Sequence, residues 1–373
     1  MSAPPPVPLA APTRLWPDEA AAVRQAVAAV IDSERWILGP AVAGFEAAFA
    51  DYVGAADCVG VASGTDALIL ALTCFDLPAG TGVLVPANDG GFAAMAALRA
   101  GLTPIAMDVE HRSLLPGIED AEAAWRSSTH EVRAMVVTHL HGDAAPMFAL
   151  DAWRRERGLV LIEDCAQAHG LRVGAQHVGT IGDAGTFSFY PTKNLGAVGD
   201  GGAVVFGQAS QAAERARVLR QYGWEPAYRI AYAGGLNSRL DELQAAVLSA
   251  RLRFLDARNQ RRRQIADHLR TAAQSAGLSA HGEPLTTVAH HLVVRTPQRD
   301  ALASHLADAG IQTAIHYPTV LSQMPGLGAM AETPVARTLS QEVLSLPCFP
   351  ELNDGEVERV GASLAAWSQE DPS

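Results

Sequence analysis

The sequence predicts an α/β fold, in which a large domain with a mostly parallel seven-stranded sheet is followed by a smaller α+β domain. The first observation behind this prediction is a set of short apolar runs of strand length, at residues 57–62, 82–86, 103–108, 134–140, 158–163, 185–190 and 202–206. Several of these runs are continuous rather than alternating, which is typical of strands covered on both faces. The second observation is that Ala-rich helical stretches separate most of the first five runs, as in parallel sheets.

The third observation is a change of sequence texture from about residue 240. A long Arg-rich helical pattern covers residues 240–275, and the runs 290–295 and 311–317 have the composition of strands. Near the N-terminus, the spacing of apolar residues predicts helices over residues 17–34 and 43–53.

These patterns divide the chain into three parts. We predict a Pro-rich N-terminal arm over residues 1–14, a large domain over residues 15–250 and a small C-terminal domain over residues 251–373. The arm begins MSAPPPVPLAAP, which lacks the basic start and apolar centre of a signal peptide. We expect it to be disordered or loosely attached.

Composition argues against several classes of partner. The chain has 28 Lys and Arg against 40 Asp and Glu, a formal charge of −12, whereas nucleic acids and acidic membranes select basic surfaces. No apolar run approaches the roughly 20 residues of a membrane span. The four cysteines lie far apart without a CxxC pair, as expected of reduced thiols in a cytoplasmic protein: Cys58, Cys74, Cys165 and Cys348. A nucleophilic Cys165 is the less favoured interpretation, because free cysteines usually pack as small hydrophobes.

Polar residues follow three of the predicted strands, where a parallel sheet places its ligands. Ser63, Gly64 and Thr65 open a helix, and free N–H groups at a helix start favour an anion such as phosphate. Asp164 follows the run 158–163, and Lys193 follows the run 185–190. Each of these features alone has an ordinary explanation, as a helix cap, a structural carboxylate or an exposed loop charge.

Together, the three features predict a site for pyridoxal phosphate. The amine of Lys193 would hold the cofactor as a Schiff base, and the carboxylate of Asp164 would keep its pyridine nitrogen protonated. The turn at residues 63–65, with Ser188, would hold the phosphate. Burial would lower the pKa of Lys193, so that its amine could act as a nucleophile and carry protons. An NAD-dependent oxidoreductase is disfavoured, because no GxGxxG follows the first strand.

Longer motifs lie along nearly the whole chain: WILGPAVAGFE (36–46), VASGTDAL (61–68), THLHGD (138–143), LIEDCAQAHG (161–170), GTFSFYPTKNLGAVGDGGAV (185–204), GLNSRLDELQAA (235–246) and IQTAIHYP (311–318). These segments, in this order, resemble the DegT/DnrJ/EryC1/StrS family of nucleotide-sugar aminotransferases, of pyridoxal phosphate fold type I.

This resemblance implies roles for individual residues. Lys193 and Asp164 match the catalytic lysine and the partner of the pyridine nitrogen. The remaining cofactor contacts that it implies are Gly64, Thr65 and Ser188 at the phosphate, Gln167 near the ring oxygen, and Asn237 reaching the phosphate from a neighbouring subunit. A homodimer with shared active sites is therefore expected.

The sequence departs from the family pattern at two places. After VPAN the family has threonine and an aromatic residue that stacks on the cofactor, whereas Asp89 and Gly90 stand here. Phe92 is our candidate for the missing ring. The second departure is His141, which replaces a tyrosine. His139 and His141 alternate along the predicted strand near Asp143, but this spacing is weak evidence for a metal, and we predict none.

The resemblance also implies a reaction. An amino acid, by family habit L-glutamate, would leave pyridoxamine phosphate, which then aminates a keto-deoxysugar nucleotide, with a dTDP-3-keto-6-deoxyhexose preferred. Alternatives are a 4-keto sugar nucleotide, or a non-catalytic regulator on the same fold. A sugar dehydratase is disfavoured, because that branch has histidine at the lysine position. Residues expected at the substrate are Trp36, Tyr190, Arg239, His316 and Tyr317.

Overall fold

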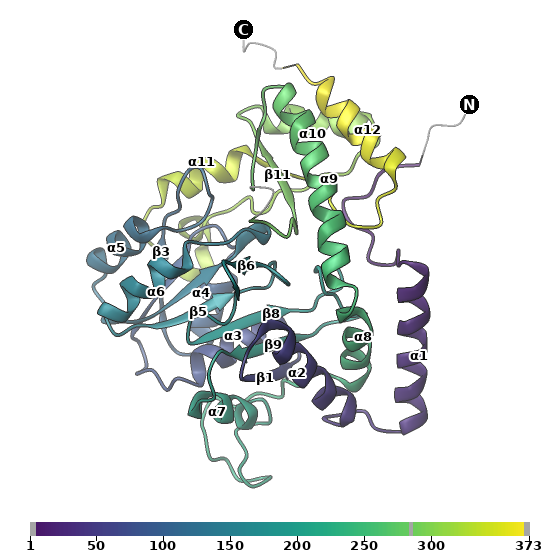
Figure 1. The fold of residues 1–373 in the computed structure, drawn as a ribbon. Helices are drawn as coiled ribbons and strands as arrows, with labels where there is room; N and C mark the ends of the chain where they lie inside the picture. The colour runs from purple at the N-terminus through teal and green to yellow at the C-terminus, as the bar shows by residue number, and fades with distance from the viewer. Residues whose placement is uncertain (1–4, 283–285, 369–373) are drawn as a thin grey trace.

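The computed structural model describes residues 5–282 and 286–368, and its centre is a seven-stranded sheet (Figure 1). The strands lie in the order β1-β9-β8-β5-β4-β2-β3. Their bounds are Asp57–Val61 (β1), Gly202–Phe206 (β9), Ala184–Ser188 (β8), Val160–Asp164 (β5), Val132–Thr138 (β4), Gly82–Pro86 (β2) and Thr103–Met107 (β3). β9 runs antiparallel to both of its neighbours, β1 and β8, whereas the other neighbouring pairs are parallel. The mostly parallel seven-stranded sheet is thus confirmed, and no predicted strand end is displaced by more than two residues.

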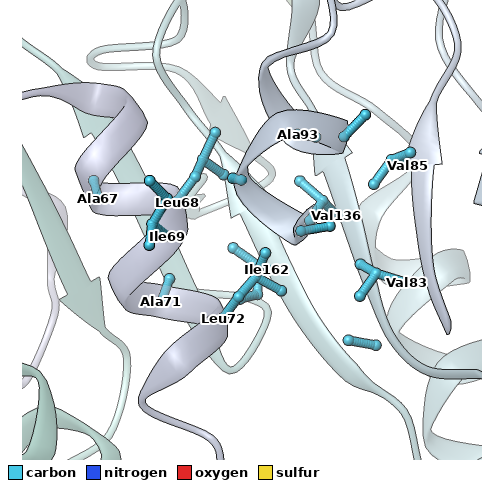
Figure 2. Close-up of a cluster of buried hydrophobic side chains, with 14 of the residues drawn as sticks. Ala67, Leu68, Ile69, Ala71, Leu72, Val83, Val85, Ala93, Val136 and Ile162 are labelled. Carbon is cyan, nitrogen blue, oxygen red and sulfur yellow. The ribbon is translucent and has the colours of Figure 1, made fainter. Parts of the chain in front are cut away.

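Both faces of the sheet are covered, which explains why the strand sequences are continuously apolar. On one face, Val83, Val85, Val136 and Ile162 pack against α3 (Gly64–Thr73) and α4 (Phe92–Arg99), as Figure 2 shows. On the other face, the alternate residues of the same strands pack beneath α5 (Ile118–Ser127) and α6 (Met147–Glu156): Leu84, Met135, Val137 and Leu161. The sheet therefore holds its strand ends, and the residues that follow them, in a fixed frame.

Five further helices precede β1 or follow β9 along the chain. They are α1 (Pro17–Ser33), α2 (Pro40–Val53), α7 (Gln211–Leu219), α8 (Glu242–Leu252) and α9 (Leu255–Ser275). The helical pattern predicted over residues 240–275 forms two helices, because the chain turns at Arg253 and Phe254. This turn lets α8 pack against α1 and α2, while α9 leaves them to pack against α12 (Asp354–Ala365).

The C-terminal part contains a second, antiparallel sheet. Its strands are β10 (Ser279–Ala280), β11 (Leu292–Arg295) and β12 (Val343–Leu346), in that order, with α10 (Arg299–Asp308) and α11 (Pro334–Glu342) between the last two along the chain. The strand predicted at 290–295 is β11. The domain boundary placed at residue 250 remains a prediction. A small hairpin of β6 (Arg172–Val173) and β7 (Gln176–His177) completes the strands of the described residues.

The strand predicted at residues 311–317 is wrong. Its backbone makes only isolated bridges, from Ile311 to Val7 and from Ala314 to Ser345. Because these two partners lie in different places, no continuous ladder forms, and the segment continues towards the main sheet. Val7 is fully buried there, so the expectation of a loose N-terminal arm does not hold at Val7. Within the described ranges, no helix has the length and hydropathy needed to cross a membrane.

Candidate active site

A cavity of about 370 Å³ opens at the carboxyl ends of the parallel strands. The residues that line it come from the ends of β2, β4, β5 and β8, from the start of α3 and from the C-terminal part: Ser63, Gly64, Thr65, Leu68, Asp89, Phe92, Thr138, Leu140, Asp164, Ala166, Gln167, Ser188, Tyr190, Lys193, Asp200 and Tyr317. Four strand ends that are distant in sequence therefore meet at one site, as parallel topology requires.

Lys193 reaches this cavity from the turn after β8. Its backbone N–H donates to the carbonyl of Tyr190 at 2.8 Å, which closes the turn. The next residue, Asn194, is buried, and its side-chain amide donates to Oδ1 of Asn259 and to the carbonyl of Val288. Burial lowers the pKa of the Lys193 amine to about 8, although the charge of Asp164 opposes this shift. A neutral, nucleophilic amine is thus accessible near physiological pH.

Asp164 is the last residue of β5, and its carboxyl group faces the same cavity. The N–H of Ala166 donates to Oδ1 at 3.0 Å, and the hydroxyl of Thr138 lies 3.5 Å from Oδ2. Burial raises the pKa of Asp164, whereas the hydrogen bond from Ala166 and the charge of Lys193 act against this rise. A cationic partner in the cavity would therefore favour the carboxylate form.

Gln167 is held on the wall beside Asp164. Its Oε1 accepts a hydrogen bond from the backbone N–H of His141 at 2.6 Å, and its Nε2 donates to the hydroxyl of Tyr317 at 3.2 Å. Both ends of the amide are used, so its orientation is set by the protein. Gln167 thereby connects the turn after β4 with the C-terminal part of the chain.

The start of α3 forms the third wall. The side chain of Ser63 caps the helix by accepting from the N–H of Asp66 at 3.1 Å. Gly64 lies so close to Ser188 that a Cβ on it would come within 2.5 Å of the Ser188 Cβ. The N–H groups of Gly64 and Thr65 lie in the first turn, where no helical carbonyl precedes them, and both residues line the cavity. This wall suits the phosphate of an anionic ligand.

The amine, the acid and the anion-binding turn predicted from the sequence are thus brought together in one cavity. Their donor set fits pyridoxal phosphate, which needs an amine for its aldehyde, a carboxylate for its ring nitrogen and N–H donors for its phosphate. Residues predicted at the cofactor or substrate that line this cavity are Gly64, Thr65, Phe92, Asp164, Gln167, Ser188, Tyr190, Lys193 and Tyr317.

Four predicted residues do not line the cavity within this chain. Trp36 is 49% exposed, and its carbonyl accepts from the N–H of Glu242. Asn237 is exposed, and its backbone bridges to Gln221. His316 stacks on His291, with ring centroids 4.1 Å apart, and bonds to the hydroxyl of Ser345. The fourth residue, Arg239, is half-buried in the same loop as Asn237.

Sequence analysis missed a role for Asp89 as a member of this site. Asp89 is 3% exposed, and its two carboxyl oxygens accept from the N–H groups of Gly91 at 2.8 Å and Ala93 at 2.9 Å. Burial raises its pKa to about 7, and the charge of Asp164 adds to this shift. The available signal was an aspartate three residues after a buried apolar strand. The other lining residues that sequence analysis did not single out are Leu68, Thr138, Leu140, Ala166 and Asp200.

The histidines near Asp143 do not form the metal site considered above. β4 ends at Thr138, so His139 and His141 lie in a tight turn rather than alternating along a strand. Nε2 of His139 lies 3.2 Å from Glu163, and its Nδ1 accepts from the N–H of Ala145, so both ring nitrogens are occupied. Asp143 pairs instead with a histidine of the C-terminal part, His281, at 2.8 Å.

Glu163, His139 and Cys165 place possible ligand atoms within 4.8 Å of one another. Both oxygens of Glu163 already have partners, since Oε1 accepts from the N–H groups of Ile181 and Gly182. Hydrogen bonding within the protein therefore accounts for this cluster. Cys165 is fully buried and burial raises its pKa, so it lacks the thiolate character of a nucleophile.

Comparison with known proteins agrees with this geometry. A model of the DegT/DnrJ/EryC1/StrS aminotransferase family matches residues 17–365. The chain is 40% identical over 355 residues to a dTDP-3-amino-3,4,6-trideoxy-alpha-D-glucose transaminase of Streptomyces venezuelae, covering 92% of this chain and 91% of the relative. It is 40% identical over 347 residues to a dTDP-3-amino-3,6-dideoxy-alpha-D-galactopyranose transaminase of Aneurinibacillus thermoaerophilus, covering 91% and 93%.

The similarity extends to a solved structure. The crystal structure of S. venezuelae DesV in complex with a ketimine intermediate matches with a TM-score of 0.93 and 38% identity, covering 99% of this chain and 100% of that one. The residues matched by the family model include every residue that lines the cavity and every strand of the main sheet. The chain is therefore a pyridoxal-phosphate-dependent aminotransferase that belongs to the DegT/DnrJ/EryC1/StrS aminotransferase family.

Proposed function

We propose that this enzyme transfers an amino group from L-glutamate to the C3 keto group of a dTDP-3-keto-6-deoxyhexose. The observation that carries the proposal is the meeting of Lys193 and Asp164 in one cavity, in a chain whose relatives include two transaminases named for dTDP-3-amino sugars. A relative 38% identical, from Acidithiobacillus ferrooxidans, is named as a 3-aminotransferase of a UDP-sugar. This name supports amination at position 3 but not the choice of dTDP as the nucleotide.

Different lining residues would contact different parts of the cofactor. Lys193 would attach it covalently, Asp164 would pair with its ring nitrogen, and Gln167 would approach its ring oxygen. At the other end, Ser188 and the first-turn N–H groups of Gly64 and Thr65 would hold its phosphate. When bound and protonated at the ring nitrogen, pyridoxal phosphate supplies an electron sink for the substrate carbon that loses a proton.

Lys193 is also the residue proposed to move that proton. Its amine, with a pKa lowered to about 8, can accept a proton from the donor amino acid and return one without a large energetic penalty. The nearby Asp164 carboxylate limits how far this pKa falls, since it favours the charged amine. The same group would then serve both halves of a ping-pong reaction.

We propose that the exposed residues around the cavity contact the sugar nucleotide and a second subunit. Tyr190 is 52% exposed on the cavity wall, where it can contact the sugar. The loop before Asn237 exposes Tyr228 and Ile230 at 86% and 70%, which supports its burial against a second copy of the chain. We propose that Asn237 and Arg239 reach a neighbouring subunit's site, and that Trp36 and His316 act at the substrate.

A direct assay tests the substrate. Purified enzyme is incubated with L-glutamate and either a dTDP-3-keto or a dTDP-4-keto-6-deoxyhexose, and the products are examined by mass spectrometry and NMR. An amine at C3 is expected. Amination at C4 alone would replace the proposal with a 4-keto specificity. Failure with both sugars, while L-glutamate still converts the bound cofactor to pyridoxamine phosphate, would show that the acceptor is wrong but the donor right.

A further inference from the structure

Two consecutive glycines connect Asp89 and Phe92, which both line the cavity, and the ring of Tyr317 lies beside the first of them. Gly90 and Gly91 have φ values of 80° and 85°, a region that favours glycine. A Cβ on Gly90 would lie 3.1 Å from Cδ1 of Tyr317 and 3.2 Å from Cε2 of Phe92. Position 90 thus contributes no side chain to the cavity, and Tyr317 approaches its backbone closely.

Tyr317 is held in place on several sides. Phe92 packs against its ring edge-to-face, with centroids 6.1 Å apart and planes at 69°, and His316 packs at 5.4 Å and 89°. Its hydroxyl accepts from Nε2 of Gln167 at 3.2 Å. Burial and the charges of Asp89 and Asp164 raise the pKa of Tyr317, so it remains a neutral phenol across the working pH range.

We propose that Tyr317 supplies the aromatic surface on which the pyridine ring of the cofactor packs, and that Phe92 supports Tyr317 from behind. This inference rests on the proposed cofactor contacts of Lys193 and Asp164, which line the same cavity. Tyr317 is the least exposed of the aromatic residues that line the cavity, since Phe92 is 43% and Tyr190 52% exposed. Offset or edge-on packing of two rings stabilises them beyond the area that they bury.

Tyr317 belongs to a different part of the chain from the other proposed cofactor contacts. Tyr317 lies between α10 and α11, in the C-terminal part, whereas Lys193 and Asp164 belong to the large sheet. A cofactor packed against Tyr317 would therefore connect the two parts. Cofactor binding should slow amide hydrogen exchange near residues 314–321 as well as near Lys193, since ordering one contact protects the segment that carries it.

Measuring cofactor affinity distinguishes the proposed role of Tyr317 from that of Phe92. Wild-type, Tyr317→Leu, Tyr317→Phe and Phe92→Leu apoenzymes are titrated with pyridoxal phosphate, and bound cofactor is followed by absorbance and circular dichroism. Tyr317→Leu should raise the Kd about five- to tenfold and weaken the induced circular dichroism, as expected for loss of an aromatic pair. Tyr317→Phe, which keeps the ring, should stay within about twofold of wild type, and Phe92→Leu, which removes only the support behind that ring, should raise the Kd less than Tyr317→Leu does.

The outcomes are distinct. A wild-type apoenzyme that binds no cofactor would overturn the proposed cofactor contacts as well. If wild type binds but Tyr317→Leu binds equally well, only this inference is wrong, and a large loss in Phe92→Leu would transfer the role to Phe92. Hydrogen exchange provides the second readout: cofactor-induced protection of residues 314–321 should be present in wild type and lost in Tyr317→Leu.

Discussion

Two buried carboxyl groups, Asp89 and Asp164, face the same cavity but have different partners. Asp164 is opposed by the cationic amine of Lys193, which favours its charged form. Asp89 has two backbone N–H donors, and the charge of Asp164 raises its pKa further. The pKa values of the two acids are therefore set by different partners. This arrangement is common where one carboxylate must remain charged beside another.

Exchanging Asp164 for Asn should change the amine opposite it. The charge of Asp164 raises the pKa of Lys193, so its removal should move that pKa below about 8. The rate at which apoenzyme binds pyridoxal phosphate should rise with pH around this midpoint, and the midpoint should be lower in Asp164→Asn. Borohydride reduction followed by peptide mapping should label Lys193 in both proteins. A wild-type midpoint near 10.5, or a label elsewhere, would contradict the assignment.

Asp89 should make the apoenzyme less stable as pH rises. Its pKa is raised from 3.8 to about 7, so the folded state binds a proton more tightly than the unfolded chain. The resulting stabilisation is complete below pH 4 and is lost as the pH rises to 7. Between pH 5.5 and 8.5, the unfolding free energy of wild type should fall by about 2 kcal/mol more than that of Asp89→Asn. Urea unfolding measures this difference, and the exposed Asp32→Asn should behave as wild type.

At the scale of elements, the start of α3 depends on its close approach to β8. Gly64→Ala places a Cβ 2.5 Å from the Cβ of Ser188, so the helix must move away from the strand end. We expect at least about a tenfold loss of cofactor affinity, because N–H groups displaced by tenths of an ångström no longer match one phosphate.

Gly44, in α2, has nothing within 4 Å of an added Cβ. Gly44→Ala is the control, and it should keep cofactor affinity while stabilising α2 by roughly 0.5–1 kcal/mol. Equal affinities in both variants would contradict the role of this turn.

Elements also differ in how well local sequence predicts them. The seven strands of the main sheet are each buried on both faces, so their apolar runs identify them without knowledge of their neighbours. The segment 311–317 has a similar composition, but a strand needs a continuous partner, and Ile311 and Ala314 bridge to different segments. Likewise, the break at Arg253 and Phe254 lets α9 pack against α12, a contact that helical periodicity does not encode.

At the scale of the whole molecule, shared active sites can be tested by complementation. Lys193→Ala lacks the amine, and Asn237→Ala lacks the side chain proposed to reach a neighbouring site. If sites are shared, mixing the two inactive variants, with mild unfolding and refolding to exchange subunits, should restore up to about a quarter of wild-type activity, because half of the subunits form mixed dimers with one intact site. Each variant refolded alone is the control. A mixture as inactive as its components, although mixed dimers form, would contradict sharing.

The sequence by itself determined the sheet, its helical layers and three groups of the site, because apolar strands and the residues at their ends are local features. Lys193, Asp164 and the turn at residues 63–65 meet in one cavity since parallel strands bring their carboxyl ends to one edge. Only the tertiary structure revealed how the wall beside Gly90 is filled. Phe92 is near Gly90 in sequence, whereas Tyr317 lies more than 200 residues further along the chain. Tyr317 reaches Gly90 only because the C-terminal part packs against the sheet, which local sequence does not encode.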